Sequence, residues 1–400
     1  MLEKCEFLVR KSSLKPGWRM VKFGDIADNI NVRVDPAKAE TDIYVGLEHL
    51  DPESLHLRRW GHPSDVTGQK MRFQKGDVVF GRRRAYQRKL AVAEFDGICS
   101  AHAMVVRAKP NVILPEFLPF FMQSDMFMER AIEISVGSLS PTINWKTMKV
   151  QEFPIPPIKE QRRIAEILWA ADTCSQKYLN VSDSLSIVRT ALVNKEIQKK
   201  NLAVPLGDLI IVGPQNGLYR PATDYGKGAP ILRIDSFYDG VVNTELELKR
   251  VNIGASNIER YKLTHRDIVI NRVNSREYLG KCGLVPDFKE DTVFESNIMK
   301  FSIDESLALP EYIVMILTSS ATKKYILSRC KDAINQSSIN QDDVKSIKIP
   351  LPDIEKQRLL VSVDVMIREQ ILDISGFSRK TLEKFKRAFK SSHRKRQSHV

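Results

Sequence analysis

The chain has 400 residues, 42% of them apolar, which is enough for two or three domains with cores of their own. Lysine and arginine outnumber aspartate and glutamate by 62 to 49, and the resulting net charge of +13 favours a polyanionic partner such as nucleic acid. The sequence shows no membrane-spanning apolar run and no secretory signal, and its five scattered cysteines and seven histidines have no disulfide or metal-binding spacing, so we expect a cytoplasmic protein without a metal.

The first half of the chain has the pattern of a mixed α/β module. Short β-branched or apolar runs at 77–80 and 103–107 are typical of strands. The stretch 115–130 begins with proline and has apolar residues three or four apart, which predicts a helix. Prolines within 154–157 end the module, because proline disfavours helix in the residue before it.

A long helix is predicted to follow. Residues 158–200 contain neither proline nor glycine, and their apolar side chains alternate at steps of three and four, which is the a/d pattern of a coiled coil. A second helix, 353–390, starts in the same frame. We expect the two helices to pair with each other, although each could instead pack on its own module. The predicted pairing residues are Ile164, Ile167, Ala171, Tyr178, Leu185, Val188, Leu192, Leu360, Val363, Ile367 and Ile374.

The second half of the chain repeats the first. Residues 114–162 and 309–358 share a Leu-Pro-Glu opening, an Ile-Asn pair, a proline-punctuated strand and a closing Gln-Arg. The Ile-Asn pairs lie 196 residues apart, and earlier echoes lie 183 and 190 residues apart, so the copies share a scaffold and differ by loop insertions. A period this long indicates a duplicated domain, because solenoid repeats run about 20–50 residues.

These observations predict an α+β protein in which two similar mixed α/β modules are each followed by a long helix. The two helices are predicted to pack as an antiparallel coiled coil, which would place the modules as a dumbbell with approximate two-fold symmetry. The expected boundaries are an N-terminal arm (1–17), the first module (18–157), the first helix (158–200), the second module (201–352), the second helix (353–390) and a basic tail (391–400).

The densest basic cluster, residues 82–89, directly follows a predicted strand and carries five positive charges in eight residues. The matching place in the second copy, 272–281, has the same order of strand, arginine, and polar loop with arginine and tyrosine. Arginine binds guanine edges and phosphates, and asparagine can read adenine. Such loops also occur as solvated hairpins, but their recurrence favours binding. With an Asn-Gly turn at 216–217, the candidate DNA-binding residues are Arg82, Arg83, Arg84, Tyr86, Arg88, Lys89, Asn216, Tyr219, Arg220, Arg272, Asn274, Ser275, Arg276, Tyr278 and Lys281.

Catalytic motifs are missing from the sequence. It contains no phosphate loop, no glycine-rich nucleotide-binding turn, no Asn/Asp-Pro-Pro-aromatic motif, no nuclease carboxylate cluster and no GxSxG elbow. We therefore predict a chain that is not an enzyme and holds no cofactor. Two other classes remain open, namely a scaffold or RNA-binding protein built on a coiled coil, and an enzyme in its own right.

Four motifs, in their order along the chain, resemble those of a known family. FQKGDVVFGR (73–82), FDGICS (95–100), INW (143–145) and FPIPPIKEQ (153–161), followed by a long helix, are similar to the specificity subunit of type I restriction–modification systems. The second copy departs from this pattern at 291–296, where the sequence reads DTVFES. The resemblance extends over nearly the whole chain, through both of its copies.

The resemblance implies two target recognition domains that each read one half of a bipartite site in double-stranded DNA. It implies that the helices set the distance between the halves and dock two methyltransferase subunits, which nuclease/translocase subunits then join. S-adenosylmethionine, ATP and Mg are expected only in those partner subunits. In this reading the chain itself is non-catalytic.

Overall fold

The computed structural model describes residues 14–199, 203–334 and 336–394, with side chains described up to Ile374. Most of the predicted N-terminal arm and of the basic tail lies outside the described residues. The chain divides into two compact units, Met1–Lys177 with Phe377–Val400, and Tyr178–Gly376. No helix in the described part combines the length and the apolar character that a membrane span requires.

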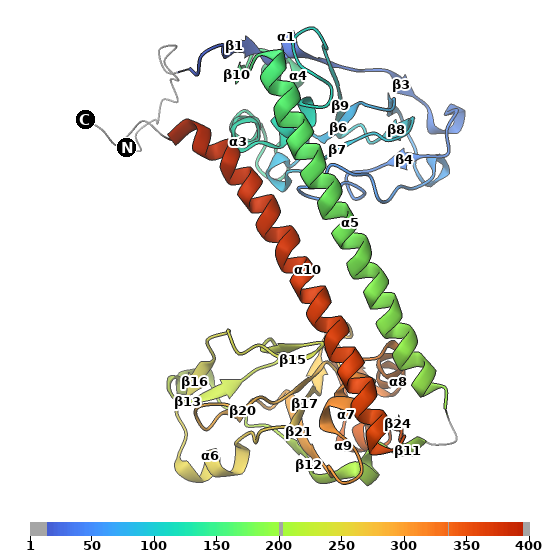
Figure 1. Cartoon of the computed structure of the whole chain (residues 1–400), viewed down its shortest axis with the longest axis vertical. Coiled ribbons are helices and arrows are strands. Elements are labelled where there is room, and N and C mark those ends of the chain that lie inside the picture. The colour runs from blue at the N-terminus through green and yellow to red at the C-terminus, as the bar shows by residue number, and fades with distance from the viewer. Residues whose placement is uncertain (1–13, 200–202, 335, 395–400) are drawn as a thin grey trace, which may run out of the picture. The chain divides into compact units, whose positions relative to one another are not determined.

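The first unit contains two four-stranded sheets with the orders β2-β9-β6-β7 and β3-β5-β8-β4. Strand β1 pairs antiparallel with β10, so the start and the end of the module lie together. The elements are β1 (Arg19–Lys22), α1 (Phe23–Ile26), β2 (Ala27–Asn29), β3 (Arg33–Val34), β4 (Tyr44–Val45), β5 (Lys70–Phe73), β6 (Val78–Gly81), β7 (Leu90–Val92), β8 (Gly97–Cys99), β9 (Ala103–Ala108), α2 (Leu118–Gln123), α3 (Asp125–Glu133), α4 (Trp145–Met148), β10 (Glu152–Ile155) and the first half of α5 (Ile158–Ile197) (Figure 1).

Phenylalanine rings fill the core between the helices and the first sheet. Phe23, Phe80, Phe121 and Phe127 are almost completely buried, and the ring centroids of Phe127 on α3 and Phe80 on β6 lie 5.8 Å apart in an edge-on arrangement. Burying one such ring contributes about 1.5–3 kcal/mol. The aromatic residues of the predicted helix thus anchor it to the first sheet.

The second unit is built on a six-stranded sheet with the order β12-β21-β17-β19-β15-β14 and two three-stranded sheets, β16-β13-β20 and β18-β23-β22. Its elements are β11 (Ala203–Pro205), β12 (Ile210–Asn216), β13 (Tyr225–Leu232), β14 (Phe237–Tyr238), β15 (Gly240–Val242), β16 (Lys249–Val251), α6 (Ala255–Tyr261), β17 (Ile268–Asn271), β18 (Val273–Asn274), β19 (Cys282–Leu284), β20 (Val293–Phe294), β21 (Ile298–Ile303), α7 (Pro310–Leu317), α8 (Ser320–Arg329), β22 (Lys331–Ala333), β23 (Gln336–Ser338), α9 (Gln341–Lys345), β24 (Lys348–Pro350) and α10 (Ile354–Arg394), together with the second half of α5.

Two helices lie where the sequence of the first module predicts one over 115–130, and the second module has a similar division. Ser124 has extended backbone and separates α2 from α3, and its hydroxyl accepts a hydrogen bond from the backbone N–H of Phe127. Ser319 separates α7 from α8 in the same way and accepts from Thr322 N–H. Serine at an N-cap satisfies a helix donor that otherwise has no partner. The helical stretch predicted over 115–130 is therefore present but divided into α2 and α3 at Ser124.

A buried glutamine fixes the start of α5 to the first module. The Gln161 side chain is 1% exposed; its Oε1 accepts from Leu114 N–H at 2.8 Å, and its Nε2 donates to the carbonyls of Val112 at 3.0 Å and Pro156 at 2.9 Å. All three partners are main-chain groups, so the side-chain amide of Gln161 provides hydrogen-bond partners for backbone groups of the module.

The second module repeats this arrangement at the start of α10. Gln357 is fully buried, accepts from Leu309 N–H at 2.9 Å and donates to the carbonyls of Leu307 at 3.2 Å and Pro352 at 2.8 Å. The duplication inferred from the Gln-Arg repeat is thus present in the hydrogen bonding, and each long helix leaves its module through the same contact.

Within the second unit, α5 and α10 pack antiparallel. Arg189 Nε lies 2.6 Å from Asp364 Oδ1, and Glu196 Oε1 lies 3.6 Å from Lys356 Nζ. Residue numbers rise along α5 while those of their partners fall along α10, so the helices run in opposite directions. The predicted antiparallel pairing of the two long helices is confirmed.

The predicted pairing residues do not all lie in the seam between the helices. Val188 is 55% exposed, while its neighbour Arg189 forms an ion pair with the buried Asp364. Ile167 is 48% exposed. Leu360 and Ile367 are buried. Half-buried side chains are Ile164, Ala171, Tyr178, Leu185, Leu192, Val363 and Ile374.

The alternative in which each helix packs on its own module also holds in part. Ile164 and Trp169 of α5 pack against the core of the first module. Leu192 of the same helix packs on the core of the second module, and Leu360 of α10 is one of the buried residues of that core. The apolar stripe of α5 therefore supports both modules as well as the helix pair.

Candidate nucleic-acid interface

Two arginines occupy the same place in the two modules. Arg82 follows β6 and Arg272 follows β17, and in each case the backbone carbonyl accepts a hydrogen bond from the isoleucine of the Ile-Asn pair, Ile143 at 3.0 Å and Ile339 at 2.9 Å. The arginine and the Ile-Asn pair thus form one contact in each copy. The two motifs are therefore joined by the same backbone hydrogen bond in both copies.

The guanidinium groups of these arginines are bound alike as well. Arg82 Nη2 donates to the carbonyl of Ala101 at 2.9 Å, and Arg272 Nη1 donates to the carbonyl of Ser296 at 3.2 Å. Both Nε atoms are buried and lack a hydrogen-bond partner among the described residues. A buried N–H without a partner costs about 1–3 kcal/mol, and such groups call for a reason beyond stability.

In the first module, Arg82 continues into a loop of uncompensated positive charge. Arg83 Nη2 and Arg84 Nε both donate to the hydroxyl of Ser140, at 3.1 and 3.2 Å. Arg84 has a left-handed backbone, with φ of 57°. Within the described ranges, no carboxylate forms an ion pair with Arg82, Arg83 or Arg84. We refer to residues 82–84 as the arginine loop.

The positive charge of the arginine loop affects the pKa of a neighbouring histidine, His102. His102 Nε2 lies 3.4 Å from Arg83 Nη1. Partial burial, followed by the charges of Arg83, Arg82 and Lys70, lowers the pKa of His102. The site therefore presents a positive field to solvent, which attracts an anion such as a DNA phosphate.

Three other candidates are already engaged inside their modules. Arg88 forms an ion pair with Asp125 at 2.9 Å, and Arg276 forms one with Asp332. Lys89 Nζ donates to the carbonyl of Leu47 at 2.8 Å. The charges of the two arginines are neutralised within the fold, which distinguishes them from the arginine loop.

The remaining candidates lie in loops or at strand ends. Tyr86 is 53% exposed and Tyr219 is 76% exposed. Asn216 ends β12 and is exposed, and Arg220 lies 3.7 Å from Asp224 while its buried Nε lacks a partner among the described residues. In the second module, Ser275 N–H donates to the side chain of the preceding Asn274 at 2.8 Å, which orders the loop after Arg272.

One aromatic residue of this region escaped the sequence-based prediction. Tyr238 is 65% exposed, and its ring centroid lies 4.8 Å from Lys281 Nζ. Tyr278 lies on the same ammonium at 5.5 Å. Tyr238 is 43 residues before Lys281 in the chain, so only the sheet brings the two together. The feature of the sequence that could have identified Tyr238 is its position directly before an Asp-Gly turn.

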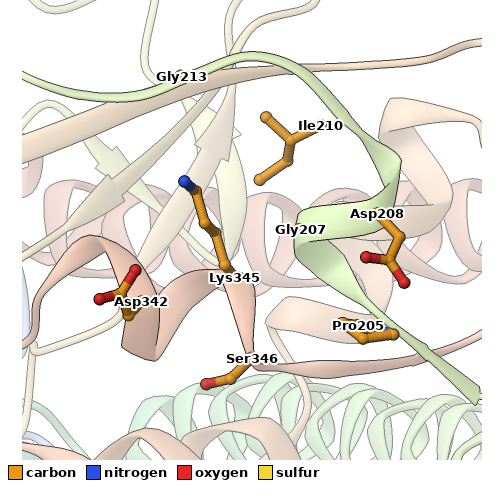
Figure 2. A pocket seen from close by; sticks show the side chains of 8 residues that line it. All are labelled: Pro205, Gly207, Asp208, Ile210, Gly213, Asp342, Lys345 and Ser346. Carbon is orange, nitrogen blue, oxygen red and sulfur yellow. The ribbon is translucent and has the colours of Figure 1, made fainter.

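A surface hollow of about 430 Å³ lies elsewhere in the second module, and Figure 2 shows the side chains around it. None of the predicted binding residues lines it; the lining residues are Pro205, Gly207, Asp208, Ile210, Gly213, Asp342, Lys345 and Ser346. Two carboxylates against one lysine disfavour an anionic ligand there. Among the described residues, no group of three or more histidine, cysteine, aspartate or glutamate side chains is placed to hold a metal ion.

Comparison with known proteins gives matches throughout the chain. The model of the type I restriction modification DNA specificity domain matches twice, at residues 16–178 and 203–363. The specificity subunit of the type I restriction enzyme EcoKI from Escherichia coli K12 is 26% identical over 283 residues, which are 66% of this chain and 61% of that protein. Two further relatives, from Methanocaldococcus jannaschii and Escherichia coli, are matched over 35% and 38% of their lengths.

Other relatives are covered more completely. The MjaVIII specificity subunit from Methanocaldococcus jannaschii is 20% identical over 92% of this chain and 90% of its own length. The S subunit of a type I restriction–modification system from M. genitalium has a TM-score of 0.55 at 13% identity, covering 92% of this chain and 96% of that one. A structure reported for complex assembly of the type I R-M system also has a TM-score of 0.55, at 19% identity and 94% coverage of this chain.

The two solved structures share the fold, and the doubled family match falls on the two modules that carry Arg82 and Arg272. These matches support DNA recognition over the alternative of a scaffold or RNA-binding protein. The chain belongs to the family of type I restriction modification DNA specificity proteins.

Proposed function

We propose that this chain recognises a split site in double-stranded DNA as the specificity subunit of a type I restriction–modification complex. Each module would read one half of the site. The duplicated arginine contacts support this, because equivalent scaffolds with different loops suit two half-sites of different sequence. Phosphate contacts would fix the register of each module, and loop side chains would reach the bases.

The proposal includes partners and their cofactors. Two methyltransferase subunits and nuclease/translocase subunits would assemble on the chain in the cytoplasm, and those subunits would carry S-adenosylmethionine, ATP and Mg. Exposed apolar side chains on the paired helices support docking of protein there, since Ile187 is 69%, Leu359 is 64% and Met366 is 57% exposed. The chain itself would perform no chemistry, in line with relatives named as specificity subunits.

The observation that carries the proposal is the arginine loop. Its three guanidinium groups are bound only to a carbonyl, a hydroxyl and a neutral ring nitrogen among the described residues. Clustered positive charge without an internal anion is the electrostatic footprint expected of a surface that binds nucleic acid.

The experiment is the triple variant Arg82→Ala, Arg83→Ala, Arg84→Ala in the assembled complex. We expect weaker binding to a duplex carrying the site found by methylation mapping. We also expect the slope of log K against log salt to fall by up to about 0.9 for each phosphate that the variant no longer binds. Filter binding between about 50 and 200 mM salt measures both quantities.

The matched control is Arg130→Ala, since Arg130 is bound to Glu133 at 2.9 Å on α3 and lies outside the loop. This variant removes a positive charge from the same module and should leave affinity and slope unchanged. Equal affinity and slope for the triple variant and the wild type would show that the arginine loop does not contact DNA.

A further inference from the structure

An ammonium group in the second module is surrounded by aromatic rings. Lys281 Nζ lies 4.8 Å from the ring centroid of Tyr238, 5.5 Å from that of Tyr278 and 5.9 Å from that of Phe237. Each distance is within the range of a cation–π contact. The rings come from β14 and from the turn before β19, so the sheet assembles them around the lysine.

The charge of this lysine is not compensated inside the module. Lys281 is half-buried, and its Nζ has neither an ion pair nor a hydrogen bond in the described part of the chain. Burial lowers the pKa of Lys281, an effect that the more distant charge of Asp235 opposes. Aromatic faces attract a cation but cannot accept its hydrogen bonds as an anion does.

The tyrosines leave this ammonium open to a ligand. Tyr238 is 65% and Tyr278 is 40% exposed, so the phenol groups stand at the surface while Phe237 closes the site from below at 1% exposure. The hydroxyl of Tyr278 is hydrogen-bonded to the carboxylate of Glu277, so that phenol is already engaged. The group that a surface anion would meet here is therefore the ammonium of Lys281.

The strand that carries Tyr238 is held rigidly. Arg368 of α10 donates to the carbonyl of Asp239, and its Nη1 lies 3.5 Å from the Asp239 carboxylate. Gly240 has φ of +85° and packs so closely that a Cβ there would lie 2.7 Å from Val314 Cγ1. A site that is ordered before binding loses less entropy when the ligand arrives.

The first module uses the equivalent lysine differently. The carbonyls of Lys89 and Lys281 accept from equivalent strand residues, Gly81 at 2.9 Å and Asn271 at 2.8 Å. Lys89 Nζ nevertheless donates to the carbonyl of Leu47 and is committed to the fold. The open ammonium is therefore particular to the second module.

We infer that Lys281, Tyr238 and Tyr278 form a binding site for one backbone phosphate of the DNA half-site read by the second module. The inference rests on the proposed function and deepens it by naming the contact and its ligand. Lys281 supplies the charge, and the Tyr238 ring holds the ammonium in place. The contact positions the module and carries no base preference.

The test uses Lys281→Met in the assembled complex, with the duplex found by methylation mapping. Methionine keeps an apolar stem among the rings and removes the charge. We expect the slope of log K against log salt to fall by about 0.9, the value for one phosphate contact. The loss of affinity should be the same for the correct second half-site and for a scrambled one.

Tyr238→Phe should bind within about two-fold of wild type, and Tyr238→Ala should lose several-fold in affinity.

The control is Ile211→Ala, which changes a side chain of similar exposure (63%) on β12, at the opposite edge of the same six-stranded sheet. It should bind as the wild type does. The phosphate assignment is wrong if Lys281→Met keeps the wild-type slope and affinity while the arginine-loop variant loses both. A loss restricted to the correct half-site, with unchanged slope, would instead make Lys281 a base-reading residue. If neither variant weakens binding, the proposed function fails.

Discussion

His56 joins the first module to α5 through two carboxylates. Its Nε2 lies 2.6 Å from Asp172 on the helix, and its Nδ1 lies 2.8 Å from Glu94. The hydrogen bond to Asp172 raises the pKa of His56 to about 9, against the opposing effect of burial. The Trp169 side chain packs edge-on against the same ring at 6.4 Å. A charged histidine thus fastens a loop of the module to the helix.

This contact predicts a pH dependence of stability. The pKa of His56 is higher in the folded state than its ordinary value of 6.5, so its stabilising effect is complete below pH 6.5 and is lost as pH rises through about 9. We expect the melting temperature of the first unit to fall by about 2–4 °C across this window, for a loss on the order of 1 kcal/mol. Thermal unfolding of wild type and of His56→Gln, followed by circular dichroism from pH 6 to 9.5, measures it.

His62→Gln is the matched control, because His62 lies 3.4 Å from Asp42 in a pair whose side chains are 54% and 95% exposed. Solvent screens such a pair, so its loss should leave the pH profile unchanged. A profile for His56→Gln as steep as that of the wild type would show that another group titrates in this window.

Residue identity alone does not separate bound arginines from free ones. The repeat correctly indicated that Arg82 and Arg272 occupy equivalent places, because both follow a strand in the same register. It could not show that Arg276 is neutralised by Asp332, since the partner lies 56 residues away in the chain. Ion pairs between distant segments depend on the tertiary fold, which the local pattern does not contain.

At the scale of elements, the apolar period predicted the long helices but not the exact seam between them. Helix α5 runs over Ile158–Ile197, without proline or glycine, as its sequence requires. The exposed positions are scattered along the predicted seam, since Ile167 and Val188 are exposed whereas Leu192, beyond both, packs on the core of the second module. Contacts with the modules, which the apolar period does not contain, therefore decide which positions are covered.

A buried carboxylate organises the seam. Asp364 is 5% exposed and accepts from Arg189 Nε and Arg368 Nε, each at 2.6 Å. Arg189 also donates to the hydroxyl of Thr318 at 3.1 Å. One aspartate therefore connects both long helices with the second module and, through Arg368, with the strand end at Asp239.

Replacing this aspartate should destabilise the second unit strongly. Asp364→Ala removes the nearer of two carboxylates shared by Arg189 and Arg368, whose side chains are 16% and 17% exposed. The other, Asp239, is 48% exposed and lies 3.5–3.6 Å from these arginines. Removing one side of a buried ion pair costs about 3–5 kcal/mol. Urea unfolding of the full chain measures this loss as a lower midpoint with an unchanged slope.

Glu355→Ala on the same helix is the control, because Glu355 is 90% exposed and lies 3.8 Å from Arg358. Its loss should cost less than about 1 kcal/mol. Equal midpoints for the two variants would show that the polar network contributes nothing to the pairing of α5 and α10.

At the scale of the whole molecule, the duplication was visible in the sequence but the division into sheets was not. Besides one two-stranded sheet in each, the first module has two four-stranded sheets, whereas the second has a six-stranded sheet and two of three strands. Many of these strands have two to four residues, such as β4 and β14. Strands this short are set by long-range pairing and burial and carry little periodic signal of their own.

The strongest test of two independent readers is an exchange of one module. Replacing residues 18–157 with the equivalent module of a relative should change one half of the methylated DNA motif and leave the other half intact. Methylation mapping of cells that carry the exchanged complex reads both halves at once. A change in both halves, or in neither, would contradict the assignment of one half-site to each module.

The boundary of this exchange, after residue 157, preserves a contact that the chain makes between the first module and α5. Gln161 remains in the host helix, and its partners in the module are the Leu114 N–H and the carbonyls of Val112 and Pro156. Because these are main-chain groups, a foreign module with the same backbone can rebuild the contact whatever its side chains. The ion pair of His56 with Asp172, by contrast, depends on a side chain of the module. A grafted module without that histidine should therefore have a lower melting temperature than the wild type below pH 9. The second module of the same chain should still select its original half-site.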